Sequence, residues 1–552
     1  DRAVATPEYA ENGMVVSARR EASKAGVEMM RRGGNAVDAA VATGFALAVV
    51  YPSSGNIGGG GFMVIRSPDG KVTTIDHRET APSGATQEVF LDETGDAARD
   101  RSRIGALASG VPGTVHGEKY GSLSRADVMA PAIRMAEEGV PLPYGVAQRF
   151  NAYRDDFLQF ESTRSYFTKP DTTDQYRPGV RWRQPDLAQT LRRIRDHGID
   201  GFYDGETAER IVDQMTSMGG LIDREDLRDY RSVERDPVST DYRGYTVHSM
   251  GPPSSGGVAL AQLLHAAEAR NLQAMGYQSS ATVHYLGEAM KRTFADRAKW
   301  LGDPDAVDIP TDALTDSAYV AERMSTFDPD RATPTDSVSA GSPAIASESV
   351  ETNHYSVVDG DGMAVSVTTT LNSSYGSKVV VDGAGFFLNN EMNDFVLKPG
   401  VPNQFGLTGT ERNLVAPGRR MVSSMTPTIV EDPDGRLFLV IGAPGGSTII
   451  STVFQVITNM IDYGMDVEQA VTAGRIHHQW RPATLHHERY TLPADVVENL
   501  EARGWEVETG IFGYDSWGRA HGIRAAYPPE RNGEPAYFGG ADPRRSGAAV
   551  GY

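Results

Sequence analysis

Residues 351–374 read ETNHYSVVDGDGMAVSVTTTLNSS, and this stretch decides the fold. Within it, residues 354–358 and 364–371 are rich in β-branched and aromatic side chains, which favour strands. The run Asp359-Gly360-Asp361-Gly362 between them is typical of a hairpin turn. The stretch therefore predicts a hairpin in the core of the protein, with Thr352 at the start of its first strand.

A segment of different character precedes the hairpin. Residues 327–351 are rich in Asp, Ser, Thr, Pro, Ala and Gly and hold almost no large apolar side chains. Such a composition is typical of an exposed, flexible tail or linker. Because a flexible segment that runs into a core strand exposes the chain at the junction, a processing site there is one interpretation. An ordinary interdomain linker is the other, and composition alone does not separate them.

The remainder of the chain mixes helices with strands. The elements expected are a strand at 14–18, a helix at 22–32 ended by Gly33-Gly34, a buried helix at 36–50 capped by Asn35, a mainly helical region at 124–324, and a strand within it at 245–249. The chain has 552 residues, 39% of them hydrophobic, so one continuous two-lobed body and two subunits both fit. We expect an α+β fold.

Composition excludes several classes of protein. The net charge of −20 at pH 7 argues against a nucleic-acid partner, whose phosphates would be repelled. The chain has no cysteine, which excludes disulfides, zinc thiolate sites and cysteine nucleophiles. No apolar stretch approaches the ~20 residues needed to span a bilayer. We therefore expect neither a nucleic-acid partner nor a membrane span.

Common catalytic and cofactor motifs are missing as well. The Gly-x-Ser-x-Gly elbow of α/β-hydrolases does not occur. The run Gly-Ala-Pro-Gly-Gly-Ser at 442–447 lacks the lysine of a phosphate-binding loop. The four glycines at 58–61 precede a strand and lack dinucleotide spacing. His477-His478 has no carboxylate pattern of a metal site around it, so we expect no metal there.

What remains is a series of short motifs. They are Gly33-Gly34-Asn35-Ala36-Val37-Asp38-Ala39-Ala40, residues 56–62, Arg78-Glu79-Thr80-Ala81-Pro82, Gly110-Val111-Pro112-Gly113, residues 252–257, 351–359, 368–374, 388–395, 421–427 and 442–447, His477-His478-Gln479-Trp480, and Asp542-Pro543-Arg544. In order and spacing they closely resemble the γ-glutamyltranspeptidase (glutathione hydrolase) family of N-terminal nucleophile hydrolases. The resemblance covers nearly the whole chain, and so many motifs in family order make it specific.

The resemblance implies a fold and a maturation step. The fold is a four-layer αββα sandwich, in which two stacked antiparallel sheets lie between helical layers. Family members cut their own chain: Thr352 Oγ attacks the carbonyl of Glu351, and water opens the ester. This step gives a large subunit, residues 1–351, and a small subunit, residues 352–552. A free α-amine has a pKa near 8, so the amine exposed on Thr352 can serve as the base for its own hydroxyl.

The resemblance also assigns residues to the active site. Thr370 returns beside Thr352 across the hairpin and orients its hydroxyl, while the N–H groups of Gly445 and Gly446 match an oxyanion hole. The substrate-binding residues implied are Arg78, Ser423 and Ser424 for the α-carboxylate of a γ-glutamyl group, and Asn372, Glu391 and Asp394 for its α-ammonium. Some bacterial relatives carry Gln where this chain has Glu391.

Residues 398–409 match the lid that covers the pocket in some family members. Their proline and glycine content indicates a loop. Phe405 falls where an aromatic lid residue, often tyrosine, is found. Because a phenyl ring excludes water but donates no hydrogen bond, we expect a lid that closes less firmly and measurable hydrolysis without an acceptor.

The activity implied is cleavage of γ-glutamyl amides such as glutathione, with transfer to water or to the amine of an amino acid or peptide. A glutaryl-cephalosporin-type acylase and a poly-γ-glutamate depolymerase of the same fold are alternatives. A glutaryl group has no ammonium and would leave Glu391 and Asp394 buried without a partner, which favours γ-glutamyl substrates. A catalytically dead scaffold would be expected to lose Thr352, Thr370 or the glycine pair, and the chain keeps them all.

The resemblance carries three further expectations. It implies no metal or organic cofactor, and two subunits formed from one precursor. It also implies a periplasmic or extracellular enzyme, although no leader is visible in this chain.

Overall fold

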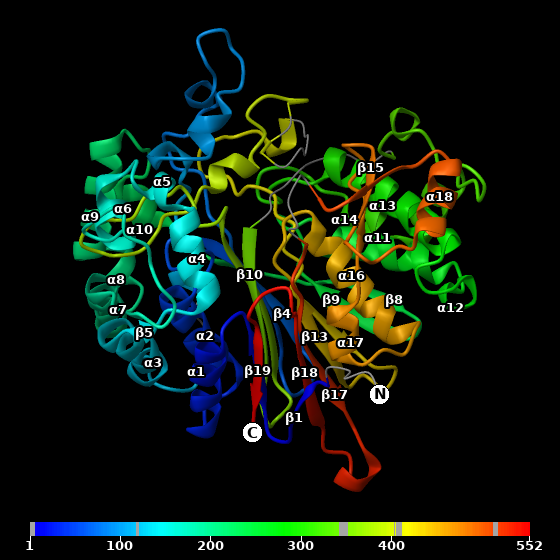
Figure 1. Ribbon diagram of the computed structural model, residues 1–552, viewed down its shortest axis with the longest axis horizontal. Helices are drawn as coiled ribbons and strands as arrows, with labels where there is room; N and C mark the ends of the chain where they lie inside the picture. The colour runs from blue at the N-terminus through cyan, green and yellow to red at the C-terminus, as the bar shows by residue number, and fades with distance from the viewer. Residues whose placement is uncertain (1–5, 118–120, 342–350, 402, 405–410, 512–516) are drawn as a thin grey trace.

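The computed structural model describes residues 6–117, 121–341, 351–401, 403–404, 411–511 and 517–552. Two antiparallel sheets stand face to face at the centre, and helices cover the outer side of each (Figure 1). The four-layer αββα sandwich expected from the resemblance is confirmed.

The first sheet holds the predicted hairpin. Its seven strands lie in the order β19-β2-β10-β11-β3-β4-β7 and pair antiparallel throughout. In that order they span Ala548–Gly551, Met14–Ser17, Glu351–Val358, Ala364–Asn372, Gly60–Arg66, Val72–His77 and Val233–Arg235. The hairpin β10–β11 occupies the centre, so the strand that begins beside Thr352 has a hydrogen-bonded neighbour on each side.

The second sheet is built on the same plan. Its seven strands lie in the order β1-β18-β17-β13-β12-β9-β8. They span Glu8–Ala10, Ala536–Ala541, His521–Ala526, Leu437–Gly442, Thr428–Glu431, Tyr245–Ser249 and Val238–Tyr242. Each sheet therefore mixes strands from both sides of Thr352 in the sequence.

Three apolar cores hold the layers together. A small one lies between the sheets and includes Val16, Val358 and Val440. The outer side of the first sheet is covered by α1 (Arg20–Arg31) and α2 (Ala36–Val50), on which α3 (Arg125–Glu138) packs. The outer side of the second sheet is covered by α11 (Gly256–Glu268), α16 (Thr448–Ile461) and α17 (Val467–Thr472), with α13 (Ser280–Trp300) packed on α11. Removing apolar surface from water is the main source of free energy that holds such layers together.

Several predicted elements have the expected bounds. Asn35 caps α2, its Oδ1 accepting from the N–H groups of Val37 (2.9 Å) and Asp38 (3.0 Å). The strand expected at 245–249 is β9. Its neighbour β8 was not predicted, because a five-residue run inside a mainly helical region gives little periodicity to detect. Across the described residues, no helix combines the length and the apolar character needed to cross a bilayer.

Candidate active site

Thr352 lies near the start of β10, against the end of β11. The register shifts between Glu351 and Asn353, because the opposite strand carries one extra residue there. Thr352 therefore faces Thr370 and Leu371, and it is buried, with 3% of its surface exposed. The strand register thus brings the predicted nucleophile beside the predicted orienting threonine.

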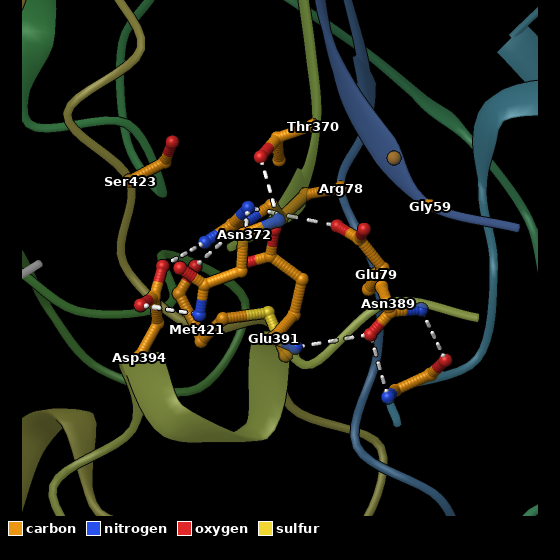
Figure 2. Close-up of polar contacts among 12 residues, drawn as sticks. Gly59, Arg78, Glu79, Thr370, Asn372, Asn389, Glu391, Asp394, Met421 and Ser423 are labelled. Carbon is orange, nitrogen blue, oxygen red and sulfur yellow. Dashed lines mark hydrogen bonds and ion pairs between the residues drawn. The ribbon is translucent and has the colours of Figure 1, made fainter. Parts of the chain in front are cut away.

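Asn372 connects this end of the hairpin to a cluster of buried charged side chains (Figure 2). Its backbone N–H donates to Thr370 Oγ1 at 2.7 Å, and its side-chain Nδ2 donates to Asp394 Oδ1 at 3.1 Å. The backbone of Asn372 is left-handed, with φ of 73°, a conformation that asparagine adopts more readily than most residues. Its Oδ1 is buried and accepts no hydrogen bond from the described residues. This oxygen is available to a donor on a ligand.

Arg78 lies at the centre of this charged cluster. It follows β4 directly, and its backbone N–H donates to Asp76 Oδ1 at 2.9 Å, which fixes the turn out of the strand. Its Nη2 is 2.7 Å from Asp394 Oδ2, and its Nη1 is 2.8 Å from Glu391 Oε2 and 3.6 Å from Glu79 Oε2. All four side chains are at most 1% exposed. One guanidinium is thus surrounded by three carboxyl groups (Figure 2).

Burial changes the protonation of two of these carboxyl groups. It raises the pKa of Glu79 to about 8, although Arg78 acts in the opposite direction. It also raises the pKa of Glu391 well above its usual value, again against the effect of Arg78. None of the four oxygens of Glu79 and Glu391 has a hydrogen-bond donor in suitable geometry among the described residues. A further cation placed beside these two acids would therefore favour their ionised forms.

The pair Gly445 and Gly446 forms the turn between β13 and α16. Gly445 has φ of 137° and Gly446 has φ of 61°. A Cβ on Gly445 would lie 2.6 Å from the Cα of Gly518, so glycine is required there. Within the described part of the chain, the N–H groups of both residues donate to no protein acceptor. These two donors match what an oxyanion hole needs.

Ser423 and Ser424 lie beside Arg78, on the segment that leads into β12. Arg78 Nε donates to the carbonyl of Met421 at 3.3 Å, which holds this segment against the guanidinium. Ser424 Oγ accepts from Arg297 Nη2 at 3.0 Å, and Ser423 Oγ accepts from the N–H of Met425 at 3.2 Å. Both serines are buried. Each hydroxyl retains its own hydrogen as a donor for an anion.

Two predicted site residues are incompletely placed. Phe405 and half of the expected lid lie outside the described residues, and nothing describes the side chain of Glu351. Among the described residues, no group of three or more His, Asp or Glu side chains is arranged to hold a metal ion.

Sequence reasoning missed three residues of the site. Glu79 stands in the quoted Arg78 motif but received no role, although a carboxyl group next to the key arginine was a signal. Asn389 holds the backbone of Glu391 in place, with its Oδ1 accepting from the N–H groups of Gly110 (2.9 Å) and Glu391 (3.0 Å). Arg297 supports Ser424 from a helix, and no pattern around it in the sequence marked it.

Comparisons with known proteins agree with this geometry. The family model for γ-glutamyltranspeptidase matches residues 22–552. The glutathione hydrolase proenzyme of Pseudomonas sp. (strain A14) is 44% identical over 99% of this chain and 95% of its own length. That of Escherichia coli (strain K12) is 45% identical over 91% of this chain and 87% of its own. The crystal structure of a cephalosporin acylase from Bacillus halodurans superimposes with a TM-score of 0.86 at 28% identity, covering 100% and 98% of the two chains. The chain is therefore an enzyme of the γ-glutamyltranspeptidase family, within the N-terminal nucleophile hydrolases.

Proposed function

We propose that the chain is a precursor that cleaves its own Glu351–Thr352 bond and then hydrolyses or transfers γ-glutamyl groups from glutathione and related amides. The proenzyme names of the two relatives support the cleavage, and their description as glutathione hydrolases supports the substrate class. The observation that carries the proposal is that three buried carboxyl groups surround the single guanidinium of Arg78, beside the strand that bears the nucleophile.

Self-cleavage begins with the hydroxyl of Thr352. Its Oγ forms a bond to the carbonyl carbon of Glu351, the C–N bond breaks, and the proton passes to the released α-amine. Water then hydrolyses the ester and leaves a carboxylate on Glu351. The bulge at this end of the hairpin supports the step, because it turns Thr352 toward Thr370 instead of continuing the regular ladder. The products are two subunits, residues 1–351 and 352–552.

Catalysis uses the same hydroxyl a second time. The free amine of Thr352 takes the proton of its Oγ, which attacks the γ-carbonyl of the donor. The N–H groups of Gly445 and Gly446 stabilise the tetrahedral oxyanion, and the amine returns the proton to the leaving group. Water or the amine of an acceptor then opens the acyl-enzyme. Thr370 orients the Thr352 hydroxyl throughout.

The charged pocket selects the γ-glutamyl group. Its α-ammonium replaces Arg78 as the partner of Glu391 and Asp394 and donates to Asn372 Oδ1. The freed guanidinium then binds the α-carboxylate, with the hydroxyls of Ser423 and Ser424 as further donors. Burial raises the pKa of Glu79 and of Glu391. The positive charge of the arriving ammonium acts in the opposite direction and favours the ionised form of each. A glutaryl group brings no ammonium and leaves these carboxyl groups unmatched.

The acylase alternative rests on the structural similarity to the cephalosporin acylase. Matched anilides decide between the two: γ-glutamyl-p-nitroanilide should be cleaved with a kcat/KM at least 100-fold above that of glutaryl-p-nitroanilide. A preference for the glutaryl compound would refute the proposed specificity. Intact mass of the purified protein, with two polypeptides that meet at Glu351 and Thr352, tests the cleavage separately.

A periplasmic or extracellular location is part of the proposal. It rests on the family resemblance and is compatible with a chain that has no cysteine. Fractionation of the source cells, with activity measured in each fraction, tests it.

A further inference from the structure

The segment that leads toward Thr352 lies along the helix α13. At its start, the backbone of Thr333 is held on both sides: its N–H donates to Glu288 Oε1 at 3.0 Å, and its carbonyl accepts from Lys291 Nζ at 2.6 Å. Arg292 Nη2 donates to Thr326 Oγ1 at 2.9 Å. Glu288, Lys291 and Arg292 are buried, at 0–3% exposure, and they pair with one another. Because Glu288 and Lys291 are buried and charged, their hydrogen bonds to the backbone of Thr333 hold this residue in one position.

The end of the described segment is held by a second cluster. The N–H of Gly341 donates to Asp296 Oδ1 at 2.8 Å, and Asp296 Oδ2 accepts from Tyr319 Oη at 2.8 Å. Arg323 pairs with Asp296 at 2.9 Å, and its Nη2 also donates to the carbonyl of Ser339 at 2.9 Å. Both Tyr319 and Arg323 belong to α15 (Ser317–Met324).

Gly341 fits this cluster only because it has no side chain. A Cβ at this position would lie 2.3 Å from Tyr319 Oη, an atom that is already bonded to Asp296. The backbone of Gly341 does not have a positive φ, so a side chain is excluded there by lack of space and not by backbone conformation. The close approach is therefore specific to the docked position of the segment.

A loop from the other side of Thr352 contacts the same segment. Trp480 Nε1 donates to the carbonyl of Val338 at 2.9 Å, and Arg481 pairs with Asp336 at 2.8 Å. The backbone of Trp480 is left-handed, with φ of 65°, which is unusual for a bulky residue. Its neighbour Gln479 accepts from the hydroxyl of Ser447, the residue after the glycine pair, at 2.7 Å. The His477-His478-Gln479-Trp480 motif thus connects the segment to the oxyanion turn.

The second cluster lies next to the segment that carries Ser424. Asp296 is followed on α13 by Arg297, which donates to Ser424 Oγ at 3.0 Å. Thr352 lies eleven residues after Gly341, so the chain between them spans about 40 Å at most. Fixing one end of so short a connection removes many conformations in which the scissile carbonyl is out of reach of Thr352 Oγ.

We propose that Asp296, Arg323 and Trp480 are positioning residues for self-cleavage, because they fix residues 338–341 and thereby present the Glu351 carbonyl to Thr352. The inference rests on the proposed cleavage before Thr352. It assigns these residues to maturation and not to turnover, so the two rates separate them from the catalytic residues. After cleavage, the same contacts keep residues 333–341 of the large subunit on α13.

Gly341→Ala tests the inference without altering any side chain of the cluster. Cell-free synthesis with a radioactive pulse, followed by denaturing gels, gives the rate at which the precursor splits. We expect cleavage 10- to 100-fold slower than in the wild type, because small displacements of reacting groups cost that much. Once cleaved, the variant should show the wild-type kcat/KM on γ-glutamyl-p-nitroanilide. The control is Gly145→Ala, on a helix position where a Cβ meets no atom within 4 Å.

A second substitution provides a rescue. Tyr319→Phe removes the oxygen 2.3 Å from the added methyl group, so Gly341→Ala/Tyr319→Phe should cleave faster than Gly341→Ala alone. Trp480→Phe, which removes the N–H bound to Val338 and keeps a ring, should also slow cleavage. Gly341→Ala that splits at the wild-type rate would overturn the inference. The inference would also be overturned if Gly341→Ala lowered the melting temperature and the kcat/KM of the mature enzyme along with the cleavage rate, because that result indicates general misfolding. A wild-type chain that never splits refutes the proposed function itself.

Discussion

The guanidinium of Arg78 lies 2.7 Å from a carboxylate oxygen of Asp394, and both side chains are buried. Asp394→Asn keeps the size of the side chain and removes its charge. We expect a loss of about 2–5 kcal/mol in transition-state binding of γ-glutamyl substrates, because a desolvated ion pair with the ammonium is lost. Glutaryl substrates, which have no ammonium, should lose less. The measurement is kcat/KM for the two p-nitroanilides.

The control for this variant is Asp434→Asn, in the exposed turn between β12 and β13 and paired with Arg436. It should leave both substrates unaffected. If Asp394→Asn lowers kcat/KM for both anilides by the same factor, Asp394 is a structural residue and the ammonium pocket is wrong.

Thr352→Ala should leave a single uncut chain with no activity, because both self-cleavage and acyl transfer begin at Thr352 Oγ. Thr352→Ser retains a hydroxyl and should still split. Intact-mass spectrometry of the three proteins checks this. Wild-type enzyme that hydrolyses a γ-glutamyl anilide while remaining one chain would contradict the role of an N-terminal amine.

Gly445→Ala should lower kcat by about 100- to 1000-fold, the cost of losing one oxyanion donor. The added methyl group would meet the Cα of Gly518 at 2.6 Å and displace the turn. Since the charged pocket is untouched, KM should change little. A variant with wild-type kcat would remove the glycine pair from the mechanism, and steady-state kinetics against the Gly145→Ala control decide.

Glu79 should make stability depend on pH. Its pKa is about 8 in the folded protein, because burial disfavours the charged form, and near 4.5 when the chain is unfolded. Between these values only the unfolded state is ionised, so unfolding releases a proton and rising pH favours it. The stabilisation from protonated Glu79 is complete below pH 4.5 and is lost as the pH rises toward 8.

Comparison with Glu79→Gln isolates this effect. The melting temperature of the wild type, minus that of the variant, should fall between pH 4.5 and 8 and level off above pH 8. Thermal unfolding at constant ionic strength measures it. A difference that stays flat from pH 4.5 to 8 would show that Glu79 is already ionised in the folded protein.

Phe405→Tyr should raise the ratio of transfer to hydrolysis with glycylglycine at alkaline pH, where the acceptor amine is unprotonated. The reason is chemical: tyrosine adds a hydrogen-bond donor to a ring that excludes water. Phe405→Leu, which has neither ring nor hydroxyl, should lower the ratio. Both ratios come from product analysis of the same reactions, and an unchanged ratio in Phe405→Tyr would remove the lid argument.

Local features of the fold were readable from the sequence. The hairpin of β10 and β11, the cap at Asn35 and the strand β9 depend on neighbouring residues, and their patterns predict them directly. The order of the four layers depends on contacts between distant segments. Periodicity gives no information on these contacts, and the family resemblance supplied the order.

The site shows the same division. The resemblance named Arg78, Glu391 and Asp394, but it did not predict that Arg78 pairs directly with both carboxyl groups, at 2.7–2.8 Å. This pairing depends on burial, because charges removed from water are stable only beside opposite charges. Arg297 had no signal either, since its role depends on where α13 meets the segment of Ser424.

The two central sheets have one more consequence, for refolding. Each contains strands from before and after Thr352, and strands of the two groups are hydrogen-bonded neighbours at β2–β10 and β11–β3 in one sheet and at β1–β18 and β12–β9 in the other. Once the Glu351–Thr352 bond is cut, no covalent link joins the interleaved strands. The precursor folds in a unimolecular reaction, whereas denatured mature enzyme must recombine two chains. The recovery of activity by denatured mature enzyme should therefore depend on protein concentration. The cut that creates the nucleophile also removes the single-chain route by which the folded state was first reached.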